Sequence, residues 1–314
     1  MRFAVMCRVF AAAACVLLVL ASATAQAGIF RAYLSSQGSD ANPCTLPSPC
    51  RLLPAALVAV NDGGEIWMLD SANYNTGPVN ITKSVNILAI PGALGSVVGN
   101  GGDAIVINGA NVNVSLRNLV VLNLAGGTTG ITLTNGARLG VEGCEIYGFS
   151  SNGIFVNTPA KVSIADTVIR DNGFGGIVAS SGAVQITRTR VTGNGNVGIY
   201  AVNFSGMLPS PTTVNVSVAD SVVSGNLYGF YVLGDANFNP RVVITRSVTS
   251  NNNVGIFANL NGADVVLFQS TVSGNVNAGL QNSGSGAIIE SWGGNVVTRN
   301  GTNTSGSITT GTPL

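Results

Sequence analysis

The chain has 314 residues, of which only 9% are charged, and its formal net charge is +1. So low a charge content argues against charge-driven disorder and against a nucleic-acid-binding surface. The chain also contains no histidine, which excludes a cysteine–histidine nucleophile.

Residues 1–27 have the features of a secretory signal. Arg2 and Arg8 flank its start, residues 9–20 are apolar, and Ala25-Gln26-Ala27 is a small-x-small cleavage site. The apolar stretch is too short to span a membrane. We therefore predict export to the periplasm or the cell exterior, with no membrane span after signal removal.

Residues 28–64 are predicted to form an N-terminal cap. Cys44 and Cys50 lie close together in the proline-rich segment "NPCTLPSPC", and an oxidising compartment favours a disulfide between them. An apolar helical segment follows, ends at residues 61–64, and precedes a strand that begins at Glu65. A short helix of this kind would cover the open end of a stack of strands.

Residues 65–300 contain a repeat of about 23 residues. A glycine followed by a large apolar residue recurs with spacings of 23, 23, 22, 31, 26 and 24 residues. Apolar residues alternate within each unit as in strands, and no helical period is present. The pattern predicts an all-β, single-stranded parallel β-helix of about nine coils, with residues 301–314 as a fraying last coil or a tail.

An asparagine precedes the recurrent glycine at a constant offset in most coils. Coils of a β-helix stack about 4.8 Å apart, so that each amide can bond to the amides above and below. One coil has Phe149 at this offset and is expected to interrupt the stack. The predicted inward, structural ladder consists of Asn123, Asn172, Asn194, Asn226, Asn252 and Asn275.

Two other columns are interpreted as structural. Cys144 occupies a position that is Thr or Ser in other coils, which favours a small, free, buried thiol over a catalytic one. An outward column alternates acidic and basic residues, which favours a salt-bridge ladder over an acid–base pair. Its members are Asp166, Arg188, Asp220 and Arg246.

Three segments carry a family resemblance: "VSIADTVIRDNGFGGIV", "YLSSQGSDANPCTLPSPCRLLPAAL" and "GGEIWMLDSANYN". They resemble exported right-handed parallel β-helix proteins of the pectin-lyase-like superfamily, over roughly residues 30–300. The resemblance implies a right-handed β-helix. It implies no single activity, because the superfamily includes polysaccharide lyases, glycoside hydrolases, sugar epimerases, phage tailspikes and adhesins.

The chain lacks the catalytic motifs of that superfamily. It has no Gly-His-Gly segment and no Arg-x-Pro-x-x-Arg segment, and "YGFYVLGD" (residues 228–235) matches only the first two residues of the epimerase Tyr-Gly-x-Asp-Pro-His segment. We therefore predict no metal and no cofactor, and we favour a binding protein over an enzyme. The alternatives are a lyase or epimerase acting on uronate-type glycans, and a surface adhesin or structural rod.

A column two residues after the recurrent glycine supplies the predicted ligand face. Strand alternation directs it outward, and longer loops at residues 203–213 and 233–240 are expected to wall it. We predict that a polysaccharide lies along these aromatic rings, with Arg190 adding charge for an acidic glycan. The alternative is that the loops fold over the rings and bury them. The aromatic residues are Phe155, Tyr200, Tyr231 and Phe257.

Overall fold

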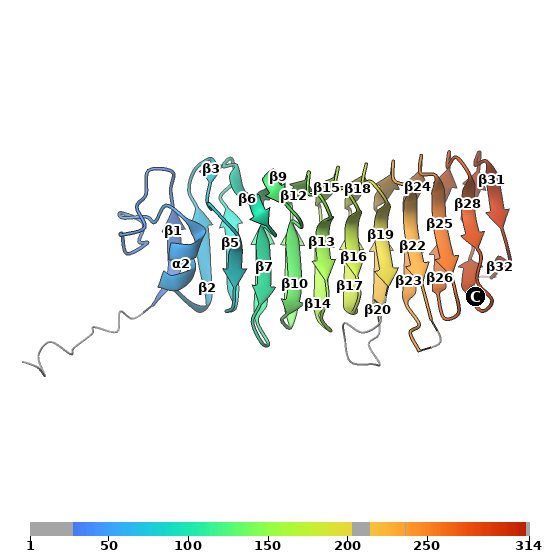
Figure 1. The fold of residues 1–314 in the computed structure, drawn as a ribbon, viewed down its shortest axis with the longest axis horizontal. Helices are drawn as coiled ribbons and strands as arrows, with labels where there is room; N and C mark the ends of the chain where they lie inside the picture. Colours follow the sequence, from blue (N-terminus) through green and yellow to red (C-terminus); the bar gives the residue numbers. More distant parts are fainter. Residues whose placement is uncertain (1–27, 203–213, 236, 312–314) are drawn as a thin grey trace, which may run out of the picture.

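The computed structural model describes residues 28–202, 214–235 and 237–311, and they form a solenoid of β-strands (Figure 1). The predicted signal and the loop at residues 203–213 lie outside the described residues. Every strand of the three sheets pairs in parallel with its neighbours, and successive coils add strands in chain order. Two sheets have ten strands each and one has twelve, close to the nine coils that the period predicted. The predicted parallel β-helix is confirmed.

The first sheet extends over the length of the solenoid. Its strands are β1 (Ile29–Leu34), β2 (Val60–Met68), β5 (Val85–Ala89), β8 (Asn113–Arg117), β11 (Arg138–Glu142), β14 (Lys161–Ala165), β17 (Gly182–Thr187), β20 (Val214–Ala219), β23 (Arg241–Thr245), β26 (Asp264–Phe268), β29 (Ile288–Ser291) and β32 (Thr309–Thr310).

The second and third sheets follow the first within each coil. The second contains β3 (Ala72–Asn73), β6 (Gly95–Gly102), β9 (Leu119–Gly127), β12 (Glu145–Tyr147), β15 (Val168–Arg170), β18 (Arg190–Thr192), β21 (Val222–Ser224), β24 (Val248–Ser250), β27 (Thr271–Ser273) and β30 (Val296–Thr298). The third contains β4 (Val79–Ile81), β7 (Ile105–Asn108), β10 (Ile131–Asn135), β13 (Asn152–Val156), β16 (Gly175–Ala179), β19 (Val197–Val202), β22 (Tyr228–Leu233), β25 (Val254–Asn259), β28 (Ala278–Asn282) and β31 (Thr302–Ser305).

The core consists of the inward side chains of all three sheets. Successive residues of a strand face opposite sides, so that in β14 Ile164 is buried while Lys161 is exposed. The register places like residues over one another, as for Ile154, Ile177 and Ile199 in the third sheet. One continuous apolar core therefore follows the axis of the solenoid.

The asparagine column lies at the corner between the second and third sheets. From Asn172 to Asn275, each Nδ2 donates to the Oδ1 of the asparagine in the next coil, at 2.8–3.1 Å. From Asn194 to Asn300, each Oδ1 also accepts the backbone N–H of the asparagine in the preceding coil, at 2.9–3.2 Å. The column therefore satisfies polar groups in a part of the structure that is closed to water. Its members are Asn172, Asn194, Asn226, Asn252, Asn275 and Asn300.

Asn123 lies outside the ladder in which we had placed it. Its Oδ1 accepts the N–H of Gly127 and its Nδ2 donates to the carbonyl of Gly148. The next coil has the buried Phe149 at the corner, whose backbone N–H donates to Asn172 Oδ1 at 3.1 Å. A phenyl ring has no amide to continue the stack, so Asn123 bonds to backbone groups of its own turn and of the next coil instead.

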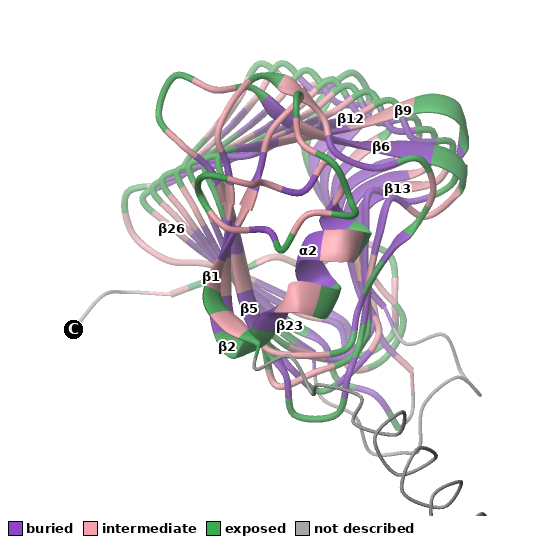
Figure 2. Cartoon of the chain, turned by 90° about the vertical axis from the view of Figure 1, so that its left-hand side faces the viewer, coloured by how far each residue is buried: buried purple, intermediate pink, exposed green. Residues whose placement is uncertain are grey.

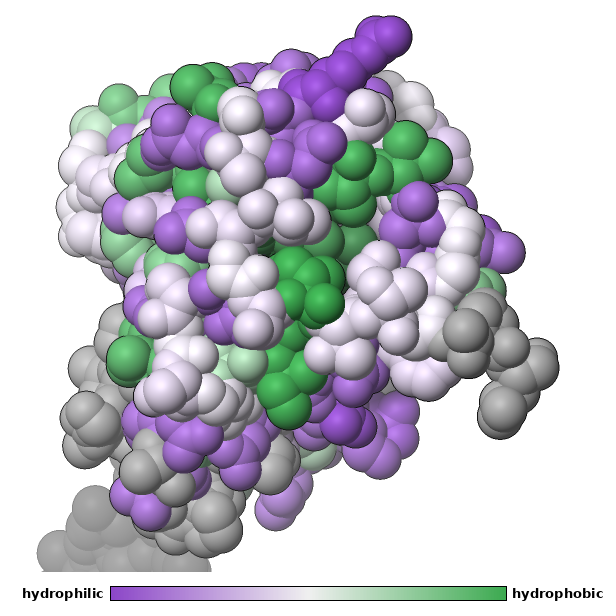
Figure 3. Space-filling model, turned by 90° about the vertical axis from the view of Figure 1, so that its right-hand side faces the viewer, coloured by the Kyte–Doolittle hydropathy of each residue, from purple (hydrophilic) through white to green (hydrophobic). Residues whose placement is uncertain are grey.

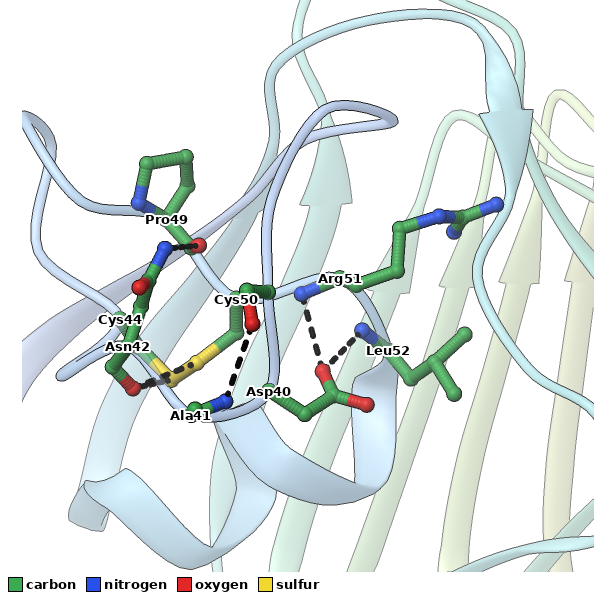
Figure 4. The surroundings of a disulfide bond; sticks show 9 residues. Asp40, Ala41, Asn42, Cys44, Pro49, Cys50, Arg51 and Leu52 are labelled. Carbon is green, nitrogen blue, oxygen red and sulfur yellow. Dashed lines mark hydrogen bonds between the residues drawn. A yellow bond between two sulfur atoms is a disulfide. The ribbon is translucent and has the colours of Figure 1, made fainter.

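The N-terminal end of the solenoid is covered by α2 (Leu53–Ala59), as Figure 2 shows. Pro54 stands in the first turn, where its missing N–H costs nothing. The carboxylate of Asp40 accepts the N–H groups of Arg51 and Leu52 at 2.9 and 2.8 Å (Figure 4). No helix in the described part of the chain is long and apolar enough to cross a membrane.

The predicted disulfide between Cys44 and Cys50 is present beside this helix (Figure 4). It closes a loop with a sequence separation of 6 residues, and both cysteines are buried. The bridge therefore holds the cap loop together where the segment has no long strand or helix of its own.

The first sheet begins earlier than the sequence indicated. β1 lies in the predicted cap and pairs with β2, which starts at Val60 and not at Glu65. Ile29 pairs with Val60 and Arg31 pairs with Glu65. Between these two pairs, one residue of β1 therefore lies opposite four residues of β2. Residues 61–64, which we expected to be a turn, form this irregularity within the strand.

The C-terminal end carries no covering helix among the described residues. The last two strands, β31 and β32, are exposed, whereas Val297 of β30 and Ile308 pack against the core. Figure 3 shows hydrophobic surface at the centre of this end. Residues 301–311 therefore form a last, exposed coil.

Candidate functional site

The predicted aromatic column faces away from the main core, but it is not open to solvent. Tyr200 and Phe257 are only 8% and 9% exposed, and Phe155 and Tyr231 are half-buried. Tyr231 stacks on Tyr200 and on Phe257, with ring centroids 4.9 Å apart in each pair. The rings therefore cover each other's faces, and the expectation of an open row is wrong.

Other side chains pack with these rings and form an apolar cluster outside the main core. Phe174 contacts Tyr200 and Tyr228 contacts Tyr231, with centroid distances of 6.2 and 5.1 Å. Burial raises the pKa of Tyr200 to about 12. Aromatic pairs of this kind stabilise a fold beyond their area of burial. The arrangement explains the column as a support for the outer side of the third sheet, while ligand binding by it stays a prediction.

Of the other groups assigned to that face, Leu233 packs against the aromatic cluster, whereas Arg190 lies elsewhere. The loop at residues 203–213 lies outside the described residues. In the loop after β22, Phe238 is buried in the main core. Arg190 is exposed on β18 of the second sheet and lines a shallow hollow with Arg188 and Asp220. The structure therefore does not place Arg190 beside the aromatic rings.

The outward charged column consists of ion pairs. Arg188 contacts Asp166 at 2.7 Å, and Arg246 contacts Asp220 at 2.8 Å. Hydrogen bonds from the arginines lower the pKa values of both carboxyl groups. These aspartates are therefore held as carboxylates, which makes them poor general acids.

Cys144 is a free, buried cysteine, as predicted from its column. Burial raises the pKa of its thiol to about 11, because the charged thiolate is poorly solvated there. Its backbone N–H donates to the hydroxyl of Thr167 at 3.3 Å. The thiol is inert at neutral pH and serves packing.

A groove of about 600 Å³ lies on the outer face of the first sheet, across β5, β8, β11, β14, β17 and β20. Its floor row consists of one outward residue from each strand, in direct register. Because most of these side chains are short, the floor is low and polar. The floor row is Asn86, Ser115, Gly140, Ser163, Gln185 and Ser217.

Gly140 keeps the middle of the floor open. A Cβ atom added there would approach only Ser115 Oγ, at 3.9 Å. The position therefore does not need glycine to avoid a clash, and any side chain here would project into the groove.

One wall of the groove carries its positive charge. The outward residue two positions before the floor residue forms this wall row, which contains Asn113, Arg138, Lys161, Ala183 and Asn215. Arg138 and Lys161 are exposed neighbours in adjacent strands. Neither takes part in the ion pairs found among the described residues.

The groove is suited to binding an anion and contains no metal site. Its lining includes no Asp or Glu, and the described residues contain no cluster of three or more potential metal ligands. Arginine and lysine donate charged hydrogen bonds to carboxylates, and the amides and hydroxyls of the floor both donate and accept. An extended, hydroxyl-rich chain with a carboxylate matches this set of groups.

Comparison with known proteins agrees with the architecture. A family model described as a right handed beta helix region matches residues 94–215. The structure of pectate lyase Pel9A matches with a TM-score of 0.68 at 16% sequence identity, covering 90% of this chain and 80% of that chain. The protein is a right-handed parallel β-helix.

Two further solved structures show the range of proteins that share this β-helix. Alginate lyase from Paenibacillus sp. str. FPU-7 has a TM-score of 0.59 at 15% identity, with 90% of this chain and 100% of that chain covered. GH136 lacto-N-biosidase from Eubacterium ramulus has a TM-score of 0.56 at 11% identity, with coverages of 90% and 68%. Among curated proteins, none matches the chain. The right-handed β-helix that the family resemblance implied is therefore confirmed as the fold.

The groove was not predicted from the sequence, although a signal for it was present. We aligned the coils on the recurrent glycine and asparagine, which define the second and third sheets. Aligning the strands that begin "RLGVE", "KVSIA" and "AVQIT" would have placed Arg138 and Lys161 side by side above a row of small residues. That these residues line a groove depends on six strands lying together in the fold, which no local pattern encodes.

Proposed function

We propose that this β-helix binds an extended, acidic polysaccharide along the groove of the first sheet. The observation that carries the proposal is a low polar floor across six strands beside the unpaired cations Arg138 and Lys161. Binding here replaces the aromatic face that we expected from the sequence, because the rings of that face are stacked on one another.

The dimensions of the groove fit a chain of sugars. Neighbouring strands lie about 4.8 Å apart, so that six strands extend over roughly 24 Å from the first to the last. This spacing is close to the repeat of one pyranose in an extended chain, which gives each sugar its own floor residue. Many weak polar contacts are expected, because an open groove leaves much of the ligand hydrated.

The comparisons support polysaccharide as the ligand class. Pectate lyase Pel9A and the alginate lyase are named for acidic polysaccharides. The second candidate is accordingly a lyase or epimerase acting on uronate-type glycans, for which the lysine and arginine of the groove would be the available polar groups. We also propose that the protein is exported, since residues 1–27 have the pattern of a signal and a disulfide is present.

The direct test removes the positive charge of the wall row. Arg138→Gln with Lys161→Gln keeps hydrogen-bonding capacity but removes both charges. A hydrogen bond to a charged group is worth about 1.5–3 kcal/mol, and the lower value corresponds to roughly a tenfold change in affinity. We expect acidic polysaccharides to bind the double variant at least about tenfold more weakly, measured by isothermal titration calorimetry.

The matched control is Arg299→Gln, which removes an exposed cation from the corner between the second and third sheets, where Gly274 stands in the preceding coil. Its affinity should equal that of the wild type. Equal affinity of the double variant and the control would refute the groove as the site. Assaying the same mixtures for the ultraviolet absorbance of unsaturated uronates tests for the lyase, because product formation would establish that activity.

A second test fills the groove without removing charge. Gly140→Tyr places a large side chain on the floor, where the backbone and neighbours tolerate a Cβ and where tyrosine suits a strand. We expect the variant to unfold at the same urea concentration as the wild type or a higher one, and to lose polysaccharide binding. Retained binding would show that the ligand does not lie on the floor row.

A further inference from the structure

The unpaired charge on the first sheet is concentrated at two adjacent strands. Arg138 belongs to β11 and Lys161 to β14, and the two are paired in register. The groove lining on either side of them is uncharged: β5 and β8 contribute Asn86, Asn113 and Ser115, and β17 and β20 contribute Ala183, Gln185, Asn215 and Ser217.

The other cations of this face are offset by nearby acids. Beyond one end of the groove, Arg31 forms an ion pair with Glu65 at 2.8 Å. Beyond the other end, Arg241 forms an ion pair with Asp264 at 2.7 Å. Arg117, on the far side of the floor row, stands opposite Glu142 in the neighbouring strand. The positive potential of the face therefore has a single maximum near its middle.

We infer that the groove recognises a heteropolysaccharide in which one acidic sugar is flanked on both sides by neutral sugars. The inference rests on the proposed function and adds the charge pattern of the ligand. A single carboxylate at β11 and β14 receives charged hydrogen bonds from Arg138 and Lys161, while neutral sugars on both sides present hydroxyls to the amides and hydroxyls of the floor.

A homouronate, which is a polysaccharide made only of uronate sugars, fits this groove poorly for a physical reason. It carries a carboxylate on every sugar, and one repeat corresponds to about one strand spacing. Carboxylates over β5, β8, β17 and β20 would lose part of their hydration and gain no cation in return. Repulsion between neighbouring carboxylates would stay uncompensated outside the central pair of strands.

The test compares the binding of oligosaccharides that have equal length but differ in which of their sugars carry a carboxylate. An array of linear oligosaccharides is read with the wild-type protein, and it includes neutral glucans, oligogalacturonates, oligoalginates and gellan fragments, whose repeat has one glucuronate among neutral sugars. We expect the members with one isolated uronate to bind at least about tenfold more tightly than homouronates or neutral chains of equal length. In Arg138→Gln with Lys161→Gln, this preference over neutral chains should disappear, and in Arg299→Gln it should persist.

The outcomes separate this inference from the proposed function. Binding of homouronates as tight as, or tighter than, that of chains with an isolated uronate would overturn the inference and leave acidic polysaccharide binding standing. Equal binding of neutral and singly acidic chains would overturn it as well. Absence of binding across the whole array would refute the proposed function itself, and the inference with it.

Discussion

Replacing Asn194 with alanine tests the ladder at an interior position, bonded to asparagines in both neighbouring coils. In the wild type, Asn194 Oδ1 accepts the backbone N–H of Asn172 at 3.2 Å and its Nδ2 at 3.0 Å. Asn194 Nδ2 donates to Asn226 Oδ1 at 3.1 Å. The substitution therefore leaves two buried donors of Asn172 without a partner, whereas Asn226 Oδ1 keeps the N–H of residue 194.

The magnitude follows from these two donors. A buried group left unsatisfied costs about 1–3 kcal/mol, so that Asn194→Ala should lower the free energy of unfolding by roughly 2–6 kcal/mol. The control is Asn277→Ala, which truncates an exposed asparagine two residues after Asn275 of the ladder. It should change the free energy of unfolding by less than about 0.5 kcal/mol. Urea denaturation followed by circular dichroism measures both.

One result would refute the reasoning. If both variants unfold at the same urea concentration with the same slope, the amide bonds between coils contribute no net stability. A lower slope in Asn194→Ala alone has a different meaning, because it would indicate that part of the solenoid unfolds separately from the rest.

The remaining predictions concern the thiol, the ion pairs and the aromatic cluster. Mass mapping after alkylation should find Cys144 labelled only in denaturant, because the thiol is buried with a raised pKa; labelling of the native protein would contradict this. The pKa of Asp220 is lower in the folded state, where Arg246 donates to it, so the pair stabilises the fold at neutral pH and this contribution is lost as the pH falls below about 4. Asp220→Asn should therefore reduce the acid sensitivity of the unfolding midpoint, and an unchanged pH profile would show that the pair does not matter. Tyr200→Ala should destabilise the protein by about 3–5 kcal/mol, as for other buried aromatic residues, yet leave the polysaccharide affinity of the folded protein unchanged; a loss of affinity without a loss of stability would restore the aromatic face as the ligand site.

The features that the sequence predicted well depend on local spacing. The alternation in segments such as "KVSIA" determines which residues face inward, and the constant offset of the asparagines determines that their amides meet in successive coils. The disulfide was predictable because only six residue positions separate Cys44 from Cys50 in an exported chain. The prediction that the β-helix is right-handed came from the family resemblance and not from the spacing of residues.

The features that were missed depend on what packs against a residue. Alternation correctly directed Tyr200 and Tyr231 away from the main core, but it could not show that the two rings stack with centroids 4.9 Å apart. The start of β2 was misplaced because its irregularity arises from pairing with β1, a strand some 30 positions earlier in the chain. The groove was missed because it depends on six strands together.

The stacking of the coils in chain order has a consequence for how the chain folds. Each coil pairs only with the coil before it and the coil after it, so that folding can begin in any group of coils and spread in both directions. Growth towards the N-terminus ends at α2 and the disulfide loop, which cover that end of the stack. Every pairing in this growth joins segments that are close in the sequence, so that the long solenoid forms without ever closing a loop much longer than one coil.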